Sequence, residues 1–515
     1  MNEDWIVCDA SERRVVFLAE LLALALRPGD LVALSGDLGA GKSTFARALV
    51  RAALDDPEAE VPSPTFSLVQ SYRTARFEIA HLDLYRLAGP DDLAELGIDE
   101  ALSRGVALLE WPERAGDALP EPALTIVFSE TDDPGVRDLA LEANDGFRDR
   151  LHRLAAIADF VQDAYAGVET LPTVRYLQGD ASPRAYARLA ADGQQAVLMD
   201  SPRRPDGPPV RDGLPYSRIA RLAEDVRPFV AVATALGDAG LSAPTLIDHD
   251  IPRGLLLLED LGDGVFAEAL ARGTPQATLW EAATDVLLDV RSIAIDRPLP
   301  LPDGSDHVVP PYDRAALTIE TELLLDWLWP LVTGQPAAAD LRAEFAAHWQ
   351  HLFDRLLALP AGLVLRDYHS PNLMWLPERP GVRRVGILDF QDAVRGHPAY
   401  DLVSLLQDAR IDVPAELERA LYDRYARAAA TRDTEFSATD FAFAYAALGV
   451  QRNTKILGIF ARLAMRDGKP RYLAHLPRIW GYLDRGLAHA ALEPLAGWYQ
   501  RHWPAARRVV PRWPT

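Results

Sequence analysis

The chain has 515 residues, 49% of them hydrophobic and 25% charged, and its formal net charge is −22. This length is too great for one hydrophobic core, and a prior of one domain per ~150 residues predicts about two to four domains. The negative charge excludes non-specific binding to nucleic acid, because a phosphate backbone would be repelled over most of the surface. The single Cys8, a start without signal-like features and the lack of any apolar run near the ~18 residues of a membrane span predict a cytoplasmic protein without membrane contact.

The first chemical motif is a glycine-rich loop, Gly36-Asp37-Leu38-Gly39-Ala40-Gly41-Lys42-Ser43, which matches every fixed position of the pattern G-x-x-x-x-G-K-S. It lies between an apolar run at 31–34 and a helix-like stretch at 44–54, as this motif requires. Lys42 would reach the β- and γ-phosphates, and the Ser43 hydroxyl would bind magnesium. The residues predicted to bind ATP here are Gly36, Gly39, Ala40, Gly41, Lys42, Ser43 and Thr44.

An acid ends the apolar run Val106-Ala107-Leu108-Leu109-Glu110. A carboxylate at the end of a hydrophobic strand is the usual second half of a P-loop site, where it orients magnesium or its water. We therefore predict that Glu110 is a catalytic residue and a metal ligand. A Pro-defined loop, Pro62-Ser63-Pro64-Thr65-Phe66-Ser67, supplies hydroxyl groups nearby in the sequence.

The first domain is predicted to end in a hairpin. Two apolar stretches, 124–128 and 137–142, flank the turn signal Asp132-Asp133-Pro134-Gly135. A helix-like stretch from about 148 to 165 follows. We therefore predict an α/β P-loop domain over residues 1–150.

The rest of the chain, 151–515, is predicted to form one bilobal α+β domain of the kinase type. After about residue 265 the pattern is mostly helical, and the part before it is rich in strands. A small β-rich lobe at about 151–265 followed by a helical lobe at about 266–515 is the arrangement of kinases. The predicted strands of the small lobe are 173–177, 186–190, 196–199 and 255–259.

Two segments of this second domain have the pattern of a kinase catalytic centre: Leu365-Arg366-Asp367-Tyr368-His369-Ser370-Pro371-Asn372 and Ile387-Leu388-Asp389-Phe390. Phosphoryl transfer requires positioning and charge neutralisation, and this spacing supplies both. Asp367 would accept the proton of the acceptor hydroxyl. Asn372 and Asp389 would hold the magnesium ions that bridge the phosphates.

Other nucleotide-binding segments are less specific. The run Leu256-Leu257-Leu258-Glu259-Asp260-Leu261 is typical of the segment that joins the lobes and meets adenine, so Glu259 is assigned to the ATP site. The stretch Gly179-Asp180-Ala181-Ser182-Pro183-Arg184 has the composition of a turn that covers phosphates, although an ordinary hairpin turn has the same composition.

One expected residue is missing. A protein kinase has a lysine on its third strand to hold the α- and β-phosphates, but the matching run Ala196-Val197-Leu198-Met199 ends in methionine. Arg184 and Arg188 are the candidates to replace it, since arginine can bind phosphate through two hydrogen bonds. If neither does so, the domain is an inactive kinase that binds ATP.

The first domain resembles the TsaE family, the small ATPases of bacterial tRNA threonylcarbamoyladenosine synthesis, over residues 5–145. The segments that carry the resemblance are the glycine-rich loop, Ser63-Pro64-Thr65-Phe66, His81-Leu82-Asp83-Leu84-Tyr85-Arg86 and Glu110-Trp111-Pro112-Glu113. The resemblance implies a P-loop ATPase that acts with TsaD- and TsaB-type proteins. These partners would hold the tRNA.

The same resemblance assigns roles to further residues. Lys42 and Ser43 would bind phosphate and metal, while Thr65, Asp83 and Glu110 would orient the metal and water. Asp83 alone is also compatible with a turn or a helix cap. Trp111 is compatible with a place beside the nucleotide and with ordinary aromatic core packing.

The second domain resembles the aminoglycoside phosphotransferase and choline kinase superfamily over residues 155–500, and within it the anomeric kinases of N-acetylmuramate and N-acetylglucosamine (AmgK). The resemblance rests on Gly179-Asp180-Ala181-Ser182, Val197-Leu198-Met199-Asp200-Ser201-Pro202, Arg366-Asp367-Tyr368-His369-Ser370-Pro371-Asn372-Leu373, Lys455-Ile456-Leu457-Gly458-Ile459-Phe460-Ala461-Arg462 and Arg466-Asp467-Gly468-Lys469-Pro470-Arg471-Tyr472. It implies that an ATP- and magnesium-dependent kinase of an N-acetylated amino sugar, part of cell-wall recycling, follows the ATPase.

The residues that recognise the acceptor follow no motif in this sequence. His369, Asp392 and Arg471 are weak candidates for sugar recognition, since a lone polar residue near a motif is as often structural. An aminoglycoside, choline or homoserine kinase and an ATP-binding pseudokinase scaffold are the alternatives.

Overall fold

The computed structural model describes residues 4–87, 93, 96–168, 170–177, 184–203 and 205–511. Contacts between residues divide the chain into two compact units. The first comprises residues 1–202 and 247–260, and the second comprises 203–246 and 261–515. The predicted junction near residue 150 lies inside the first unit, at the start of a helix. The domain boundary near residue 150 therefore stays a prediction.

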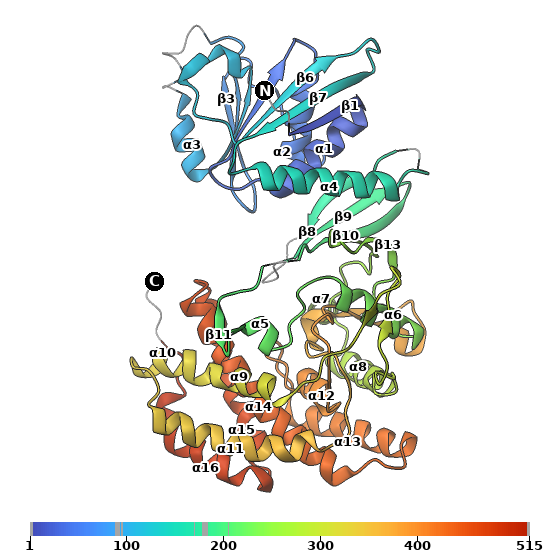
Figure 1. Cartoon of the computed structure of the whole chain (residues 1–515), viewed down its shortest axis with the longest axis vertical. Helices are drawn as coiled ribbons and strands as arrows, with labels where there is room; N and C mark the ends of the chain where they lie inside the picture. Colours follow the sequence, from blue (N-terminus) through green and yellow to red (C-terminus); the bar gives the residue numbers. More distant parts are fainter. Residues whose placement is uncertain are drawn as a thin grey trace. The chain divides into compact units, whose positions relative to one another are not determined.

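A seven-stranded sheet forms the N-terminal part of the first unit (Figure 1). Its order is β1-β7-β6-β2-β5-β4-β3, in which β6, β2, β5 and β4 run parallel and the other pairings are antiparallel. Both central strands, β2 and β5, are buried apolar runs, which is typical of parallel strands covered on both faces. The strands are β1 (Trp5–Ser11), β2 (Leu31–Gly36), β3 (Val69–Arg73), β4 (Glu78–Asp83), β5 (Gly105–Glu110), β6 (Leu124–Glu130) and β7 (Val136–Ala143). The predicted hairpin is confirmed as β6 and β7.

Four helices accompany this sheet, namely α1 (Glu12–Ala25), α2 (Lys42–Leu54), α3 (Ile98–Arg104) and α4 (Arg148–Ala164). Helix α1 has a side-chain cap, since the Ser11 hydroxyl accepts from the backbone N–H of Arg14 at 3.3 Å. Helix α2 begins at Lys42, within the last two residues of the glycine-rich motif. Helix α4 confirms the helix predicted at about 148–165.

A second, five-stranded sheet completes the first unit, with the order β13-β14-β10-β9-β8. Its strands are β8 (Thr173–Leu177), β9 (Ala185–Ala191), β10 (Gln194–Asp200), β13 (Leu246–Asp250) and β14 (Leu255–Glu259). All four strands predicted for the small lobe are therefore confirmed, and β13 is an addition. The neighbouring pairs β8–β9, β9–β10 and β10–β14 are antiparallel.

One hydrophobic cluster joins the two sheets of the first unit through α4, which lies between them in Figure 1. Leu154 and Ile157 of α4 belong to the same buried cluster as Phe17 of α1 and Leu198 of β10. Polar contacts reinforce this packing. Arg153 of α4 donates to Asp200 at the end of β10, with an Nε–Oδ1 distance of 2.9 Å.

The second unit is mainly helical, as predicted after residue 265. Its helices are α5 (Tyr216–Ile219), α6 (Arg227–Asp238), α7 (Phe266–Ala271), α8 (Gln276–Val290), α9 (Arg314–Leu323), α10 (Trp329–Thr333), α11 (Ala339–Leu357), α12 (Ala399–Leu406), α13 (Ala415–Arg432), α14 (Ala438–Met465), α15 (Leu476–Leu487) and α16 (Glu493–His502). Short antiparallel pairs interrupt them, namely β11 (Pro209–Arg211) with β12 (Leu214–Pro215), β15 (Leu299–Pro300) with β16 (Asp306–His307), β17 (Gly362–Val364) with β20 (Val394–Gly396), and β18 (Leu373–Trp375) with β19 (Val385–Ile387).

Helix α14 is the longest helix described in this unit, at 28 residues, and it is buried over most of its length. It passes very close to α9 at Gly458, where a Cβ would lie 2.3 Å from the carbonyl carbon of Leu323. Only glycine permits this approach, which brings the middle of α14 against the buried face of α9. None of the helices in the described part of the chain is long and apolar enough to cross a membrane.

Candidate active sites

The glycine-rich loop between β2 and α2 has the backbone shape that a phosphate-binding loop needs. Gly36, Gly39 and Gly41 have φ values of 137°, 87° and 107°, in the left-handed region that favours glycine. A Cβ on Gly36 would also lie 2.5 Å from the carbonyl oxygen of Phe128. Lys42 begins α2, and its Nζ donates to the carbonyl oxygen of Gly36 at 2.6 Å. The loop therefore curls around the ammonium of its own lysine.

The carboxyl ends of three neighbouring strands meet beside this loop. Strand β5 pairs with both β2 and β4, so that Glu110 lies opposite Leu34 on one side and Asp83 on the other. Glu110 accepts a hydrogen bond from the Ser43 hydroxyl at 2.8 Å, and Asp83 accepts one from the Thr65 hydroxyl at 3.0 Å. The fold thus brings together all four side chains that the sequence assigned to metal and water.

The Lys42 ammonium also lies over an aromatic ring. Its Nζ is 3.6 Å from the ring centroid of Trp111, a geometry that attracts a cation. Burial lowers the pKa of Lys42, and the nearby carboxylates of Glu110, Glu113 and Asp83 oppose this change. Trp111 is half-buried and also packs against a small apolar cluster. Both uses considered for Trp111 are therefore compatible with its position.

A buried histidine supports the acid at the end of β5. The His81 Nε2 lies 2.9 Å from Oε1 of Glu110, and each of the two residues is only 1% exposed. The other carboxylate oxygen of Glu110 is the one bonded to Ser43. His81 belongs to the sequence motif 81–86, which assigned it no role. His81 and Asp83 are two residues apart on β4, so the alternation of side chains along a strand could have placed both on the same face of the sheet.

In the second unit, the predicted catalytic residues also lie together. The Asn372 Nδ2 donates to the carbonyl oxygen of Asp367 at 3.0 Å and to Oδ2 of Asp389 at 3.4 Å. Backbone pairing links the two segments, since β18 pairs with β19 and the N–H of Leu388 donates to the carbonyl oxygen of Asn372 at 2.9 Å. Asp389 has a φ of 57°, in the left-handed region, and the side-chain amides of Asn372 and Gln391 each donate to one of its carboxylate oxygens.

Buried polar groups hold the loop that carries Asp367. Asp401 of α12 is 1% exposed and accepts hydrogen bonds from the backbone N–H groups of Leu365 and Arg366, at 2.7 and 2.9 Å. Burial raises the pKa of Asp401 to about 7, although these two hydrogen bonds act in the opposite direction. The Ser404 hydroxyl donates to the carbonyl oxygen of Arg366 at 3.1 Å. Helix α12 therefore fixes the backbone immediately before the predicted base.

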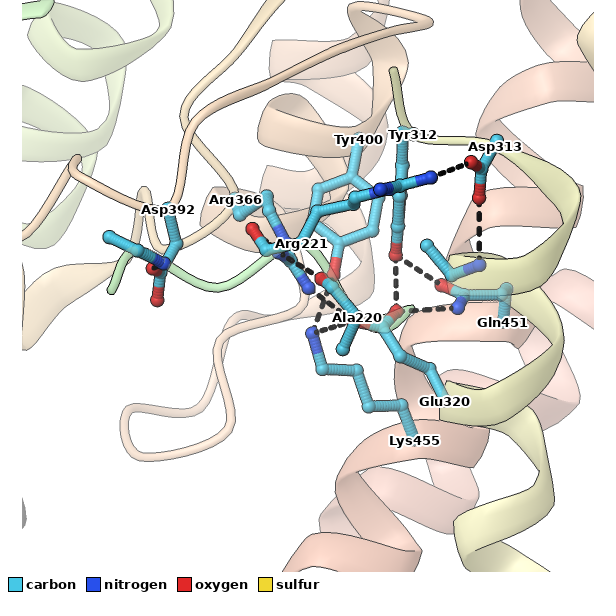
Figure 2. Close-up of polar contacts among 12 residues, drawn as sticks. Ala220, Arg221, Tyr312, Asp313, Glu320, Arg366, Asp392, Tyr400, Gln451 and Lys455 are labelled. Carbon is cyan, nitrogen blue, oxygen red and sulfur yellow. Dashed lines mark hydrogen bonds and ion pairs between the residues drawn. The ribbon is translucent and has the colours of Figure 1, made fainter. Parts of the chain in front are cut away.

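A buried ion cluster lies on the other side of Arg366 (Figure 2). Glu320 of α9 is fully buried and pairs with the guanidinium of Arg366 and, at 2.9 Å, with the ammonium of Lys455 on α14. Tyr312 and Gln451 also donate to its Oε2. Burial alone would raise the pKa of Glu320, but Lys455 and Arg366 bring it down to about 2. The three charges leave a net positive charge beside the catalytic loop.

Two families match this chain. The family described as threonylcarbamoyl adenosine biosynthesis protein TsaE matches residues 10–138, and the phosphotransferase enzyme family matches residues 173–439. This chain belongs to the phosphotransferase enzyme family. It carries a TsaE domain ahead of that part. The protein is therefore an enzyme that combines a TsaE-family P-loop ATPase with a phosphotransferase domain, and the predicted fold classes of both parts are confirmed.

The relatives fall into the same two groups. The N-acetylmuramate/N-acetylglucosamine kinase of Caulobacter vibrioides is 42% identical over 347 residues, which cover 64% of this chain and 92% of that protein. The tRNA threonylcarbamoyladenosine biosynthesis protein TsaE of Rickettsia felis is 42% identical over 116 residues, 22% of this chain and 67% of that protein. A crystal structure of aminoglycoside phosphotransferase APH(2'')-Ib with ADP is 14% identical, covering 64% of this chain and 99% of that chain, with a TM-score of 0.38.

Of the residues predicted for the phosphotransferase site, Asp367, Asn372 and Asp389 belong to the second unit. Arg184, Arg188 and Glu259 belong to the first unit. Glu259 ends β14. Arg188 on β9 lies opposite Val197 and forms an ion pair with Asp260, with an Nε–Oδ2 distance of 2.5 Å. Arg184 immediately precedes β9. The rest of the predicted phosphate-covering turn, 179–183, lies outside the described residues.

The three weak candidates for sugar recognition have different surroundings. His369 lies close to the predicted base, with 3.9 Å between its Nε2 and Oδ1 of Asp367, and burial lowers the pKa of His369. Asp392 accepts from the backbone N–H of Ala223 at 2.6 Å. The Arg471 guanidinium lies 5.4 Å from the ring centroid of Tyr472. Of the three, His369 is the one whose position beside Asp367 is established.

Proposed function

We propose that the TsaE domain is a magnesium-dependent ATPase that supports the threonylcarbamoyladenosine modification of tRNA. Its partners are TsaD- and TsaB-type proteins, and these hold the tRNA, because a chain with a net charge of −22 repels a phosphate backbone. The observation that carries the proposal is the meeting of Ser43, Thr65, Asp83 and Glu110 beside the glycine-rich loop.

The residues of this site fit ATP and magnesium. The positive-φ glycines direct backbone N–H groups inward for phosphate, and Lys42 adds a cation on the same turn. Hydroxyl and carboxylate oxygens are the ligands that magnesium prefers. When bound, the metal neutralises charge on the phosphates. Glu110 then orients water, and His81 keeps the carboxylate of Glu110 in one orientation.

We propose further that the phosphotransferase domain is an ATP- and magnesium-dependent anomeric kinase of N-acetylmuramate and N-acetylglucosamine, which acts in cell-wall recycling. The relative from Caulobacter vibrioides, matched over 92% of its length, supports this acceptor class. Asp367 accepts the proton of the anomeric hydroxyl, which is more acidic than an ordinary alcohol and so suits a carboxylate base. Asn372 and Asp389 hold the metal, and Arg184 and Glu259 contact the nucleotide.

The product decides this proposal. The full chain would be incubated with ATP, magnesium and either sugar, and the products analysed by phosphorus NMR together with an assay of the reducing end. We expect the 1-phosphate, which has lost its reducing end. A 6-phosphate that keeps its reducing end would contradict the anomeric assignment.

Two alternatives stay open: an acidic chain suits a cationic acceptor, and methionine at position 199 motivates a pseudokinase. A panel that includes an aminoglycoside, choline and homoserine separates another small-molecule kinase from a sugar kinase. A domain that binds ATP but transfers phosphate to none of these acceptors would be the pseudokinase scaffold. Because the TsaE domain also hydrolyses ATP, phosphorylated product and not ATP loss is the quantity to measure.

A further inference from the structure

The second unit contains a cavity that none of the assigned residues explains. Its volume is about 480 Å³, within the usual range for small-ligand sites. Its walls come from three segments far apart in the sequence: the stretch between β12 and α6, the end of β16 with the residues after it, and the turn that follows Asp389. The cavity therefore lies beside the predicted metal-binding loop.

Three side chains that line this cavity have a buried polar atom with no hydrogen-bond partner among the described residues. They are Nε of Arg221, Nε2 of His307 and Oε1 of Gln391. Gln391 is only 3% exposed. A buried polar atom without a partner has lost its hydrogen bonds to water and gained none in return, so three of them around one cavity indicate a polar ligand.

Hydrogen bonds connect the walls of the cavity to the catalytic segments. The Gln391 Nε2 donates to Oδ1 of Asp389 at 2.9 Å, so the amide that offers its oxygen to the cavity is fixed by a predicted metal ligand. The residue before Arg221 also contacts a catalytic segment, since the Arg366 Nη1 donates to the carbonyl oxygen of Ala220 at 2.9 Å. Figure 2 shows this contact beside Arg221. The cavity is thus connected to the predicted metal ligand Asp389 and, next to Arg221, to the residue that precedes the predicted base.

The charges around the cavity are balanced. Each of three lining arginines pairs with an acid: Arg218 with Glu224, Arg221 with Asp313 and Arg227 with Asp225. Burial lowers the pKa of His307, which favours the neutral imidazole at neutral pH. A balanced set of donors and acceptors suits a neutral, hydroxyl-rich ligand better than a phosphate or a polyamine.

We propose that this cavity binds the acceptor saccharide of the phosphotransferase domain, with Arg221, His307 and Gln391 as its specificity-determining residues. The Arg221 Nε–H donates to a sugar oxygen, and the Gln391 Oε1 accepts from a hydroxyl or from the N–H of an acetamido group. This inference rests on the proposed sugar kinase activity. It assigns recognition to the stretch between β12 and α6, where the sequence showed no motif.

The test uses two single variants of the full chain, His307→Leu and Arg221→Met, with N-acetylglucosamine as the acceptor. Each removes the hydrogen-bonding group proposed for the sugar, so we expect KM for the sugar to rise about tenfold or more, the scale of one lost hydrogen bond. Arg221→Met also removes the ion pair with Asp313. KM for ATP should stay within about twofold. His348→Leu, a half-buried histidine on α11 outside the cavity, is the matched control and should leave both values unchanged.

The unfolding temperature of each variant separates loss of recognition from loss of fold. If a folded His307→Leu variant and a folded Arg221→Met variant both kept the wild-type KM for the sugar, the cavity would not be the acceptor site. Equal rises in KM for ATP and for the sugar would also overturn it. A wild-type chain that phosphorylates no sugar would instead refute the proposed function.

Discussion

Two buried carboxylates, Glu320 and Asp401, hold the loop of the predicted base, and their environments act on their charges in opposite ways. Two cations beside Glu320 keep its pKa near 2. Asp401 accepts from two backbone N–H groups, but burial dominates and its pKa is about 7. At the scale of the residue, the loop that carries Asp367 is therefore held by the ion cluster of Glu320 on one side and by the carboxyl group of Asp401 on the other.

Removal of the charge on Glu320 should destabilise the second unit. Glu320→Gln leaves Arg366 and Lys455 buried without their shared anion, and breaking a buried pair costs about 3–5 kcal/mol. Thermal unfolding of the full chain measures this loss. Glu344→Gln, which breaks an ion pair with the exposed Arg501, is the control and should cost at most about 1 kcal/mol. Equal effects of the two variants would contradict the account of the ion cluster.

Asp401 should make stability depend on pH below about 7. Its folded pKa is about 7 and its ordinary value is 3.8, so the folded state retains a proton that the unfolded state loses. The contribution of Asp401 to the free energy of unfolding is fully present below pH 3.8. It falls by about 1.4 kcal/mol per pH unit until the pH passes 7. The unfolding temperature of the wild type relative to Asp401→Asn should therefore decrease between pH 5 and 7 and then level off. A constant difference over this range would refute the assignment.

Sequence analysis identified Asp367, Asn372 and Asp389 but neither of these supporting acids. The catalytic residues follow a fixed spacing within short segments, which a pattern can detect. Glu320 occurs in an ordinary amphipathic stretch, Ile319-Glu320-Thr321-Glu322, in which no local feature distinguishes the buried glutamate from the partly exposed one. Its burial is decided by the close approach of α14 at Gly458, a contact between residues more than a hundred positions apart.

At the scale of the element, the TsaE site depends on the register of parallel strands. Glu110 and Asp83 lie opposite each other because β4 and β5 run parallel and both strands end at this point. The helix α2 supplies Ser43 from the next layer. Glu110 is therefore fixed at the end of β5 and is not part of the glycine-rich loop that would hold the phosphates.

Glu110→Ala should therefore impair hydrolysis more than nucleotide binding. We expect basal ATPase turnover to fall by about 10²-fold or more, the scale of one group that positions a reacting water. Affinity for a non-hydrolysable ATP analogue should change by less than about tenfold. The assay uses the full chain in an Asp367→Asn background without sugar, so that the phosphotransferase domain does not contribute. A parallel collapse of affinity would make Glu110 a direct binding residue.

The elements themselves were largely predictable. The hairpin β6–β7, the helix α4 and the strands β8, β9, β10 and β14 have clear local periodicity and turn residues. Their grouping was not predictable in the same way. Strand β14 joins β10 across the 54 intervening residues 201–254, and this pairing places 247–260 in the first compact unit. The periodicity of a strand predicts which of its side chains share a face, but it does not predict which distant strand pairs with it.

At the scale of the whole molecule, the chain combines a shared core with separate chemistry. The cluster that runs from α1 through α4 to β10 joins the two sheets of the first unit. The predicted hydrolytic residues of the TsaE site all lie in that unit, whereas Asp367, Asn372 and Asp389 lie in the second. No residue in the described ranges is assigned to both sites. We therefore expect two ATP-using activities that can be removed one at a time.

The most direct test compares Lys42→Ala and Asp367→Asn in the full chain, with basal ATP hydrolysis and sugar 1-phosphate formation measured for each. Lys42→Ala should abolish basal hydrolysis and leave sugar phosphorylation nearly unchanged, because the lysine serves only the TsaE site. Asp367→Asn should lower sugar phosphorylation by about 10²-fold or more and leave basal hydrolysis intact. If either variant lost both activities, the two sites would be coupled, and an account of two separate enzymes in one chain would be wrong.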